Sequence, residues 1–339
     1  MKVLHVLLAV WMSCALAGCR QAEEPHPPPD RVVLQLKWVH QAQFAGFYMA
    51  QDQGLYAAEN LEVRFLEGGS EVDQARRLRN GTAQFAVVPA EAVLLDNARR
   101  QRLVAVSVLY QRNPTMFVAR HGSGIVRPRD MQGKKVAVGD MDGGGFIEGI
   151  VQLQALFRQM DLDYNSLVIR PYDPLHRDFI SKEVDITPAY LVGGITKLRR
   201  QGMELNLIWP GDYGIDFYSD TLATTAEYLD KHPAIALRFL RATLKGWRRC
   251  IENQKRCVDS TMAHARVKDR GLQQEMMHNQ VALVNTGEDP IGWMQGEVWQ
   301  KMYAMLMEQG LVTTPLDDIH SVYTMRFLQD IHAGSGDEN

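Results

Sequence analysis

Short apolar runs alternate with amphipathic stretches in the first two thirds of the chain, a pattern typical of strands that are followed by helices. In the first unit the predicted strands are residues 32–36, 61–66, 85–88 and 103–109, and the predicted helices are residues 44–53, 72–80 and 91–101. Because crossover helices join parallel strands, this alternation predicts an α/β unit with a mostly parallel sheet.

A second unit of the same kind follows. Its predicted strands are residues 136–138, 167–169, 184–186 and 205–209, and its predicted helices are residues 146–159, 175–181 and 192–201. From Thr224 onward the pattern is almost entirely helical, with long runs at residues 233–253, 259–264, 271–284 and 296–309. We therefore expect two α/β lobes, with the last third of the chain packed back on the first lobe.

The N-terminus has the pattern of a targeting segment. Lys2 precedes an apolar run at residues 3–17, which is shorter than the ~20 residues that span a bilayer comfortably. The run ends in Leu16-Ala17-Gly18-Cys19, which resembles a bacterial lipobox and implies cleavage before Cys19 and lipid attachment to its sulfur. The alternative is a chance cysteine after an ordinary signal peptide.

The segments outside the predicted lobes have no apolar periodicity. Residues 1–18 are the expected signal peptide, residues 19–30 a proline-rich tether, and residues 333–339 a disordered tail. The whole chain has 339 residues, and its 37 Lys and Arg against 40 Asp and Glu leave no cationic surplus for nucleic acid. We expect a monomer that binds no nucleic acid.

Two cysteines, Cys250 and Cys257, remain in the part of the chain that is predicted to fold. Seven positions on one unbroken helix would place them about 10 Å apart, beyond the ~7 Å between Cα atoms that a disulfide allows. The polar segment between them contains Asn253, at which a helix can end and let the two cysteines meet. A disulfide and two free buried thiols both remain open.

Several segments, taken in order, are similar to substrate-binding proteins of the alkanesulfonate-binding and thiamin-pyrimidine-synthase-like families. The first contains Trp38-Val39-His40-Gln41-Ala42-Gln43-Phe44-Ala45-Gly46 within residues 36–48, and the others are residues 53–56, 60–63, 81–87, 131–138, 213–218 and 233–242. The resemblance covers residues 32–330, and the joint order of the segments is much more specific than any one of them.

This resemblance implies the α/β type II periplasmic binding protein fold, in which a hinge of two crossing strands joins two lobes that clamp a ligand. Lobe 1 would comprise residues 31–115 and 220–332, and lobe 2 residues 116–219. The crossings are expected at residues 110–119 and 213–224. Ligands of open α/β sheets bind beyond the carboxyl ends of the strands, where loops and helix N-termini converge.

The first candidate ligand-binding residues follow the first predicted strand. Trp38 can stack on a planar heterocycle, although a core aromatic is the alternative. Gln43, Phe44 and Gly46 lie where the next helix starts, so the free backbone N–H groups of its first turn are expected to hold an acceptor of the ligand.

Further candidates come from the second unit and from the crossings. The run Gly143, Gly144 and Gly145 would let backbone amides approach a ligand, although a flexible turn is the alternative and the spacing matches neither a P-loop nor a dinucleotide-binding motif. Glu148 is placed to accept from an aminopyrimidine, or else is a solvated acid in the first turn of a helix. The remaining candidates follow a strand or lie in a crossing: Pro89, Ala90, Asn113, Tyr190 and Asp216.

The chain departs from the family's enzymes at the residues that their chemistry needs. The pyrimidine synthases that it resembles carry a cysteine-rich segment where this chain has Gly214-Ile215-Asp216-Phe217-Tyr218-Ser219. Their histidine aligns with Phe44, and His40 lies four positions too early. Because no Ser/His/Asp or Cys/His spacing occurs elsewhere in the sequence, we expect no catalytic residue, metal or cofactor.

The sequence therefore favours a lipid-anchored solute receptor at the periplasmic face of a bacterial membrane. It would deliver a small planar nitrogen-containing ligand, similar to a thiamin pyrimidine precursor, to an ABC permease. Two alternatives remain: an extracytoplasmic sensory module that acts with a partner receptor, and an enzyme similar to a thiamin pyrimidine synthase.

Overall fold

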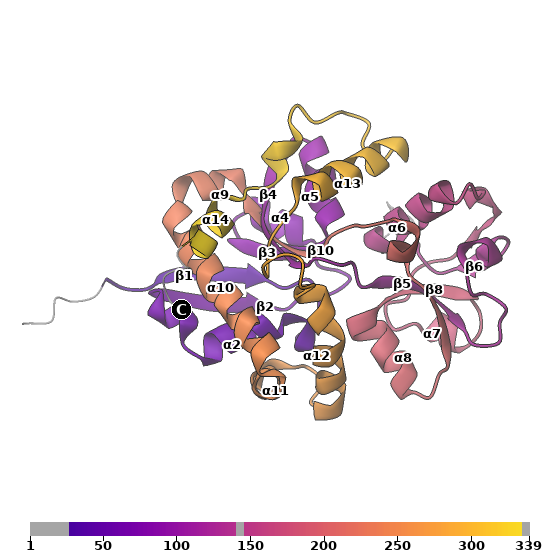
Figure 1. The fold of residues 1–339 in the computed structure, drawn as a ribbon, viewed down its shortest axis with the longest axis horizontal. Helices are drawn as coiled ribbons and strands as arrows, with labels where there is room; N and C mark the ends of the chain where they lie inside the picture. The colour runs from indigo at the N-terminus through magenta and orange to yellow at the C-terminus, as the bar shows by residue number, and fades with distance from the viewer. Residues whose placement is uncertain (1–26, 140–145, 334–339) are drawn as a thin grey trace, which may run out of the picture.

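Two lobes lie side by side in the computed structural model, which describes residues 27–139 and 146–333 (Figure 1). Each lobe is built around one five-stranded sheet. The strands of lobe 1 are β1 (Asp30–Gln35), β2 (Leu61–Leu66), β3 (Phe85–Val88), β4 (Leu103–Tyr110) and β10 (Ser219–Thr225). The strands of lobe 2 are β5 (Thr115–Arg120), β6 (Lys135–Val136), β7 (Val168–Ile169), β8 (Ile186–Tyr190) and β9 (Leu205–Ile208).

Both sheets are mixed, which differs from the mostly parallel sheet expected. In lobe 1 the order is β2-β1-β3-β10-β4, and β10 runs antiparallel to both of its neighbours. In lobe 2 the order is β7-β6-β8-β5-β9, and β5 runs antiparallel to β8 and β9. The antiparallel strands β5 and β10 are those that the chain enters directly after crossing between the lobes, and no crossover helix precedes them.

The chain crosses between the lobes at residues 111–114 and again at residues 209–218. Hydrogen bonds join the two crossings to each other. The indole Nε1 of Trp209 donates to the carbonyl of Asn113 at 2.8 Å, and the amide of Asn113 donates to the carbonyl of Tyr218 at 3.3 Å. These crossings form a connected hinge beside the boundary between the lobes.

One predicted strand lies later in the chain than expected. The strand is residues 186–190 rather than 184–186, because the N–H groups of Glu183 and Val184 both bond to the carbonyl of Asp178 in a turn. This turn closes α7 (Arg177–Ile180). Tyr190 is consequently the last residue of β8 instead of a residue beyond it.

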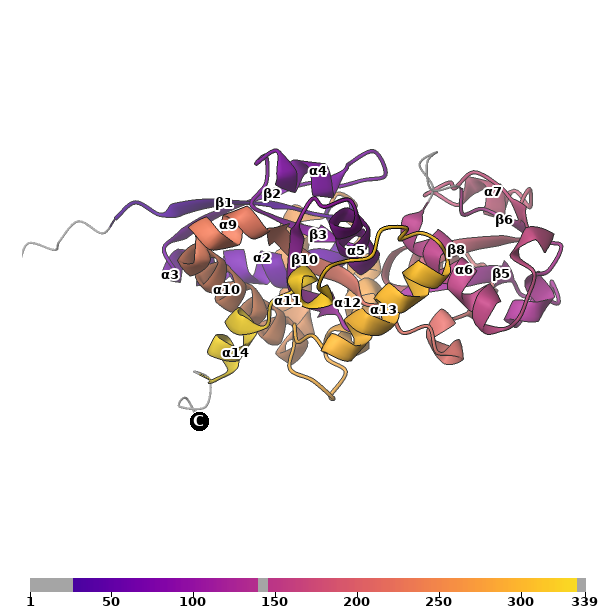
Figure 2. The same ribbon diagram turned by 90° about the horizontal axis from the view of Figure 1, so that it is seen from above.

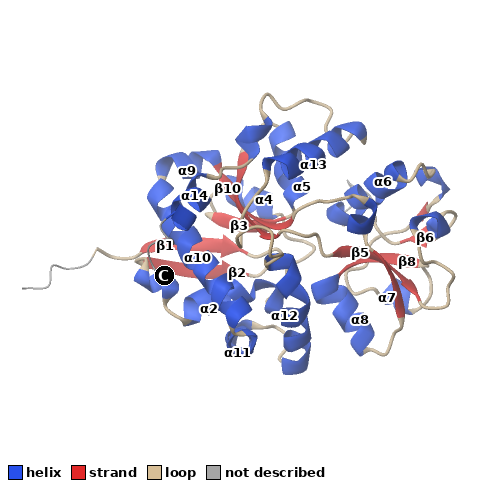
Figure 3. Cartoon of the chain, in the orientation of Figure 1, coloured by secondary structure: helices blue, strands red, loops and turns tan. Residues whose placement is uncertain are grey.

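The helices of the last third pack on lobe 1, as expected, and residues 270–284 also contact residues 191–200 of lobe 2 (Figure 2). They are α9 (Ala226–Lys231), α10 (Pro233–Glu252), α11 (Gln254–His264), α12 (Arg270–Val284), α13 (Gly296–Glu308) and α14 (Arg326–Ala333). Figure 3 shows these helices against the strands of the lobe. The strands β3 and β4 are buried along their whole length, in keeping with their uninterrupted apolar sequences.

The helices α10 and α2 (Ala45–Asp52) approach each other closely. A Cβ atom on Gly46 would lie 2.2 Å from the indole of Trp247, and one on Gly246 would lie 2.3 Å from the carbonyl oxygen of Gly46. Both positions therefore need glycine for helix packing. The structure gives Gly46 this packing role, away from the ligand-contacting role expected for it.

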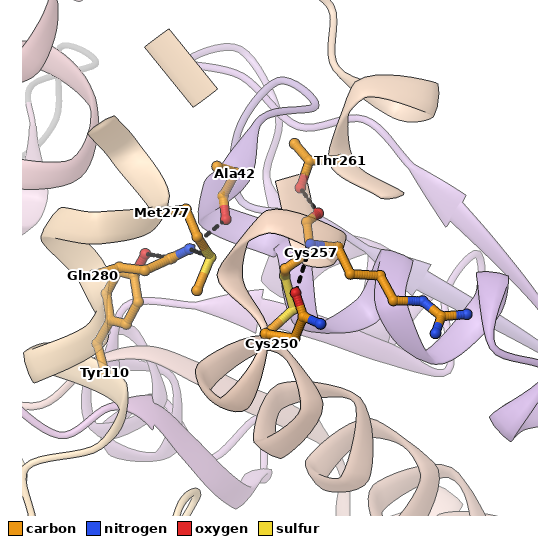
Figure 4. Close-up of a disulfide and its surroundings, with 9 residues drawn as sticks. Ala42, Tyr110, Cys250, Cys257, Thr261, Met277 and Gln280 are labelled. Atoms are coloured by element: carbon orange, nitrogen blue, oxygen red, sulfur yellow. Dashed lines mark hydrogen bonds between the residues drawn. A yellow bond between two sulfur atoms is a disulfide. The ribbon is translucent and has the colours of Figure 1, made fainter. Parts of the chain in front are cut away.

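A disulfide joins Cys250 and Cys257, whose Cα atoms are 5.0 Å apart (Figure 4). The helix breaks at Asn253, which separates α10 from α11, and the side chain of Asn253 accepts from the N–H of Arg256 at 3.0 Å to cap α11. This break brings the two cysteines together and decides between the two alternatives that the sequence left open.

Candidate functional site

A buried polar network lies where the two lobes meet, and Lys37 is at its centre. Lys37 follows β1 in lobe 1, and its side chain is only 11% exposed. Its Nζ lies 2.6 Å from Oε2 of Glu148 in lobe 2 and 3.2 Å from Oδ1 of Asp220 in lobe 1. It also donates to the hydroxyl of Tyr190. One ammonium group therefore connects acids of both lobes.

Glu148 is the acceptor of the network in lobe 2. It lies in the first turn of α6 (Ile147–Gln159), and its side chain is almost completely buried. The hydroxyl of Tyr190 donates to it at 2.5 Å, and the hydroxyl of Ser219 donates to Oε1 at 2.7 Å. Together with Lys37, these donors satisfy a carboxylate that would otherwise be costly to bury.

Asp220 is the corresponding acid of lobe 1, on β10. The side-chain amide of Gln43 donates to its Oδ2 at 2.8 Å, and the amide of Gln41 donates to Oε1 of Gln43 at 2.8 Å. Asp220 has a φ of 32°, an uncommon backbone conformation for a residue with a side chain. Such outliers cluster at functional sites, where the surrounding contacts hold them in place.

The short helix that positions Gln43 is fixed by α12. In η1 (Ala42–Phe44), the N–H of Ala42 donates to Oε1 of Gln273 at 2.8 Å, and its carbonyl accepts from Nε2 of Gln280 at 2.7 Å. The hydroxyl of Tyr110 in turn donates to Gln280 at 2.7 Å, as Figure 4 shows. The helical return thus holds one edge of the network rigidly.

Burial and the neighbouring charges shift the pKa values of these groups. Burial alone would lower the pKa of Lys37, but the charges of Glu148 and Asp220 outweigh it and raise the pKa above its usual value. Burial raises the pKa of Asp220 against the opposing attraction of Lys37. Burial and the charge of Glu148 raise the pKa of Tyr190 well above its usual value. The phenol therefore stays protonated and can donate a hydrogen bond.

Three residues proposed from the sequence belong to this network: Gln43, Glu148 and Tyr190. Trp38 is half-buried next to Lys37 and packs against the core of lobe 1. Phe44 is fully buried in that core, and its backbone N–H donates to the carbonyl of Gln41 at 3.1 Å.

The remaining proposed residues lie elsewhere. Pro89 and Ala90 begin α5 (Ala90–Ala98) at the end of β3. Asn113 is part of the hinge, and the exposed Asp216 lines a cavity of about 380 Å³ beside it. Gly143, Gly144 and Gly145, like Cys19, lie outside the described residues.

Sequence reasoning missed Lys37, Ser219 and Asp220 as site residues. A signal for Lys37 was present, because a charged residue stands between the apolar strand and Trp38 at a strand's carboxyl end. Asp220 is the charged residue within an otherwise uncharged strand, whereas the ligand-binding residue predicted for this crossing was Asp216, four positions earlier. Neither signal indicates which acid Lys37 contacts, because Glu148 and Asp220 are both more than 100 positions away from it in the sequence.

His40, the nearest histidine to the family's catalytic position, has its own partners. Its Nδ1 lies 2.9 Å from the hydroxyl of Tyr48, and its ring stacks on that of His264. Burial lowers the pKa of His40 below its usual value. Within residues 27–139 and 146–333, no group of three or more His, Cys, Asp or Glu side chains is arranged to hold a metal ion.

Three curated proteins are similar in sequence over much of the chain. The riboflavin-binding protein RibY of Chloroflexus aurantiacus is 24% identical over 91% of this chain and 88% of its own length. The formylaminopyrimidine-binding protein of Halalkalibacterium halodurans is 21% identical over 90% of this chain and 92% of its own. A 4-amino-5-hydroxymethyl-2-methylpyrimidine phosphate synthase of Legionella pneumophila is 22% identical over 64% of this chain and 68% of its own.

A solved structure confirms the fold expected from the sequence. The periplasmic aliphatic sulphonate binding protein SsuA of Escherichia coli matches with a TM-score of 0.70 at 14% identity, over 89% of this chain and 100% of that chain. The family described as NMT1/THI5 like matches residues 41–257, which is more than half of the chain. The chain therefore belongs to the NMT1/THI5-like family and has the α/β fold of type II periplasmic binding proteins.

Proposed function

We propose that this protein is the solute-binding component of an ABC uptake system and clamps a small planar nitrogen-containing ligand between its lobes. The observation that carries the proposal is the buried network in which Lys37, Asp220 and Glu148 meet at the boundary of the lobes. Carboxyl ends of strands in open α/β sheets are the usual place for ligands. The relatives named for riboflavin and formylaminopyrimidine support a planar nitrogen heterocycle as the ligand.

Trp38 is the proposed stacking platform in this site. Its backbone directly follows Lys37, and its half-buried side chain packs against the hydrophobic core. A partly exposed indole offers a flat apolar surface on which a heterocycle can stack.

Trp38→Ala is expected to weaken binding by roughly 1–3 kcal/mol, the range for a base stacked on an aromatic side chain. Calorimetric titration with riboflavin, 4-amino-5-hydroxymethyl-2-methylpyrimidine and ethanesulfonate identifies a bound compound for this comparison. Trp293→Ala is the matched control, because Trp293 is also half-buried against the lobe 1 core but contacts His332. Unchanged affinity in folded Trp38→Ala protein would remove Trp38 from the site, and the absence of binding by all three compounds would count against the proposed function.

Closure of the lobes is proposed to depend on Lys37. Its ammonium group separates Glu148 of lobe 2 from Asp220 of lobe 1, and without it these buried acids would oppose each other across the boundary. The hinge at Asn113 and Trp209 lies outside this network, so it can bend while the network breaks.

Lys37→Met should therefore open the lobes, and small-angle scattering at neutral pH should give a larger radius of gyration than for the wild-type protein. Lys231→Met provides the control, because Lys231 is exposed and pairs with Glu227 within α9. If the scattering curves of Lys37→Met and wild type coincide, Lys37 does not hold the lobes together.

Membrane attachment through Cys19 is proposed from the lipobox-like sequence Leu16-Ala17-Gly18-Cys19. In the described part of the chain, no helix is both long enough and apolar enough to cross a membrane. Two or more acyl chains on one cysteine would anchor the protein stably, since each buried CH₂ contributes about 0.8 kcal/mol.

Cys19→Ser is expected to move the protein from the membrane fraction of bacterial cells to the soluble extracytoplasmic fraction. Immunoblotting of both fractions measures this change, and Cys14→Ser serves as the control within the same leader. Cys19→Ser protein that stays with the membrane would disprove a lipid anchor at this position.

Pyrimidine synthesis is a second candidate function, because of the Legionella pneumophila relative. The structure favours binding over this activity, since His40 is engaged with Tyr48 and His264 and residues 214–219 contain no cysteine. Mass spectrometry of small molecules released from the denatured protein separates the two functions. A solute that is released unchanged supports binding, and a pyrimidine that accumulates while the purified protein is incubated supports synthesis.

A further inference from the structure

A third buried acid, Glu91, lies beside the network, and within residues 27–139 and 146–333 its side chain has no hydrogen-bond partner on another residue. Glu91 is in the first turn of α5, and its side chain is completely buried. Among the residues that the structure describes, no other residue forms a hydrogen bond with either of its carboxyl oxygens, whereas Lys37 binds both Glu148 and Asp220. Burial of an unpartnered carboxyl group destabilises a fold, so Glu91 is a group that a partner from outside the chain would satisfy.

Glu91 lies at the same edge of lobe 1 as the network. It follows β3, which is the sheet neighbour of both β1 and β10, and these two strands lead to Lys37 and carry Asp220. The charges of Glu148 and Lys37 both act on the Glu91 carboxyl group, which places it close to the boundary between the lobes.

The site as a whole contains more acid than base. Glu91, Glu148 and Asp220 surround the single ammonium group of Lys37. The other elements packed on α5 are β4, β10 and η6 (Ile319–Val322), whose titratable residues include Tyr110, Asp220 and His320. An anionic ligand would be repelled by this surplus of carboxyl groups, while a ligand that offers hydrogen-bond donors would be favoured.

We propose that Glu91 selects ligands whose heterocycle carries N–H donors, by accepting a hydrogen bond from such a group when the ligand lies between the lobes. This inference rests on the proposed solute-binding function and deepens it by naming the ligand class. An exocyclic amino group or a ring imide would supply the donor, whereas an alkanesulfonate has none.

Thermal unfolding of the protein without added ligand tests whether Glu91 is an unsatisfied group. Burial, together with the charge of Glu148, raises the pKa of Glu91 well above its usual value. Because the folded protein holds this proton more tightly than the unfolded chain, stability is lost as pH rises above the unfolded pKa. Glu91→Gln should remove this loss, so its melting temperature should exceed that of wild type by more at pH 8 than at pH 5.

Glu148→Gln is the matched control, since Glu148 is equally buried but receives bonds from Lys37, Tyr190 and Ser219. This variant should melt below wild type at both pH values. A Glu91→Gln protein that also melts below wild type at pH 8 would show that Glu91 has a structural partner, and this would overturn the proposal.

Calorimetric titration of the full chain with 4-amino-5-hydroxymethyl-2-methylpyrimidine, riboflavin and ethanesulfonate tests selection. The amino group of the first and the imide of the second are the donors. Glu91→Gln should weaken binding of a donor-bearing compound at least about tenfold. Wild-type binding should release the proton of Glu91, which titrations in buffers of different ionisation enthalpy measure, and this release should be absent from the variant.

The outcomes separate this inference from the proposed function. Equal affinities of wild type and Glu91→Gln for a donor-bearing compound, or binding of ethanesulfonate alone, would overturn the role of Glu91 and leave solute binding intact. If none of the three compounds binds to wild type, the proposed function fails, and the role of Glu91 fails with it.

Discussion

One buried lysine connects acids of both lobes, beside the contacts that α12 makes with residues 191–200 of lobe 2. Removing charges from water costs several kcal/mol per ion, and only close geometry with additional hydrogen bonds compensates for that cost. Lys37 meets this requirement through its contacts with Glu148, Asp220 and Tyr190. The hydroxyl of Ser219 donates a further hydrogen bond to Glu148. Because these groups lie on α6, β8 and β10 and two residues beyond the end of β1, the network can form only when both lobes bring these segments together.

Because each buried charge of the network needs its partners, the network is suited to a binding function. A buried ion pair contributes little net stability compared with apolar packing, but loss of one member leaves a costly unpaired charge. The arrangement at the boundary is therefore sensitive to any molecule that supplies or removes a hydrogen-bond partner. The hinge contacts of Asn113, Trp209 and Tyr218 do not include a charged side chain, so the lobes remain joined whether or not the network is formed.

Sequence reasoning predicted the parts of the structure that are encoded locally. Periodicity identified most of the strands and helices, although it placed β8 too early and did not indicate α14, and the order of the family-like segments identified the fold. The rule that ligands lie beyond strand ends led to Gln43, Glu148 and Tyr190. The structure places Phe44 in the core, because a helix start has an inner and an outer side and the sequence does not indicate which side a residue takes. The same rule failed for Lys37 and Asp220, whose importance comes from pairing with distant residues. The sequence also did not decide whether Cys250 and Cys257 form a disulfide, because their pairing depends on the helix break at Asn253.

A double-mutant cycle of Lys37 and Glu148 measures whether these two side chains stabilise the lobe boundary together. In the wild-type background, Glu148→Gln removes an acceptor that Lys37 needs, so the free energy of unfolding should fall. In the Lys37→Met background, the same change removes an acid that has lost its counter-charge, so the free energy of unfolding should rise or stay constant. Residues in contact typically show a coupling of about 0.5–3 kcal/mol. If Glu148→Gln has the same effect in both backgrounds, Lys37 and Glu148 do not act together and the account of the lobe boundary is wrong.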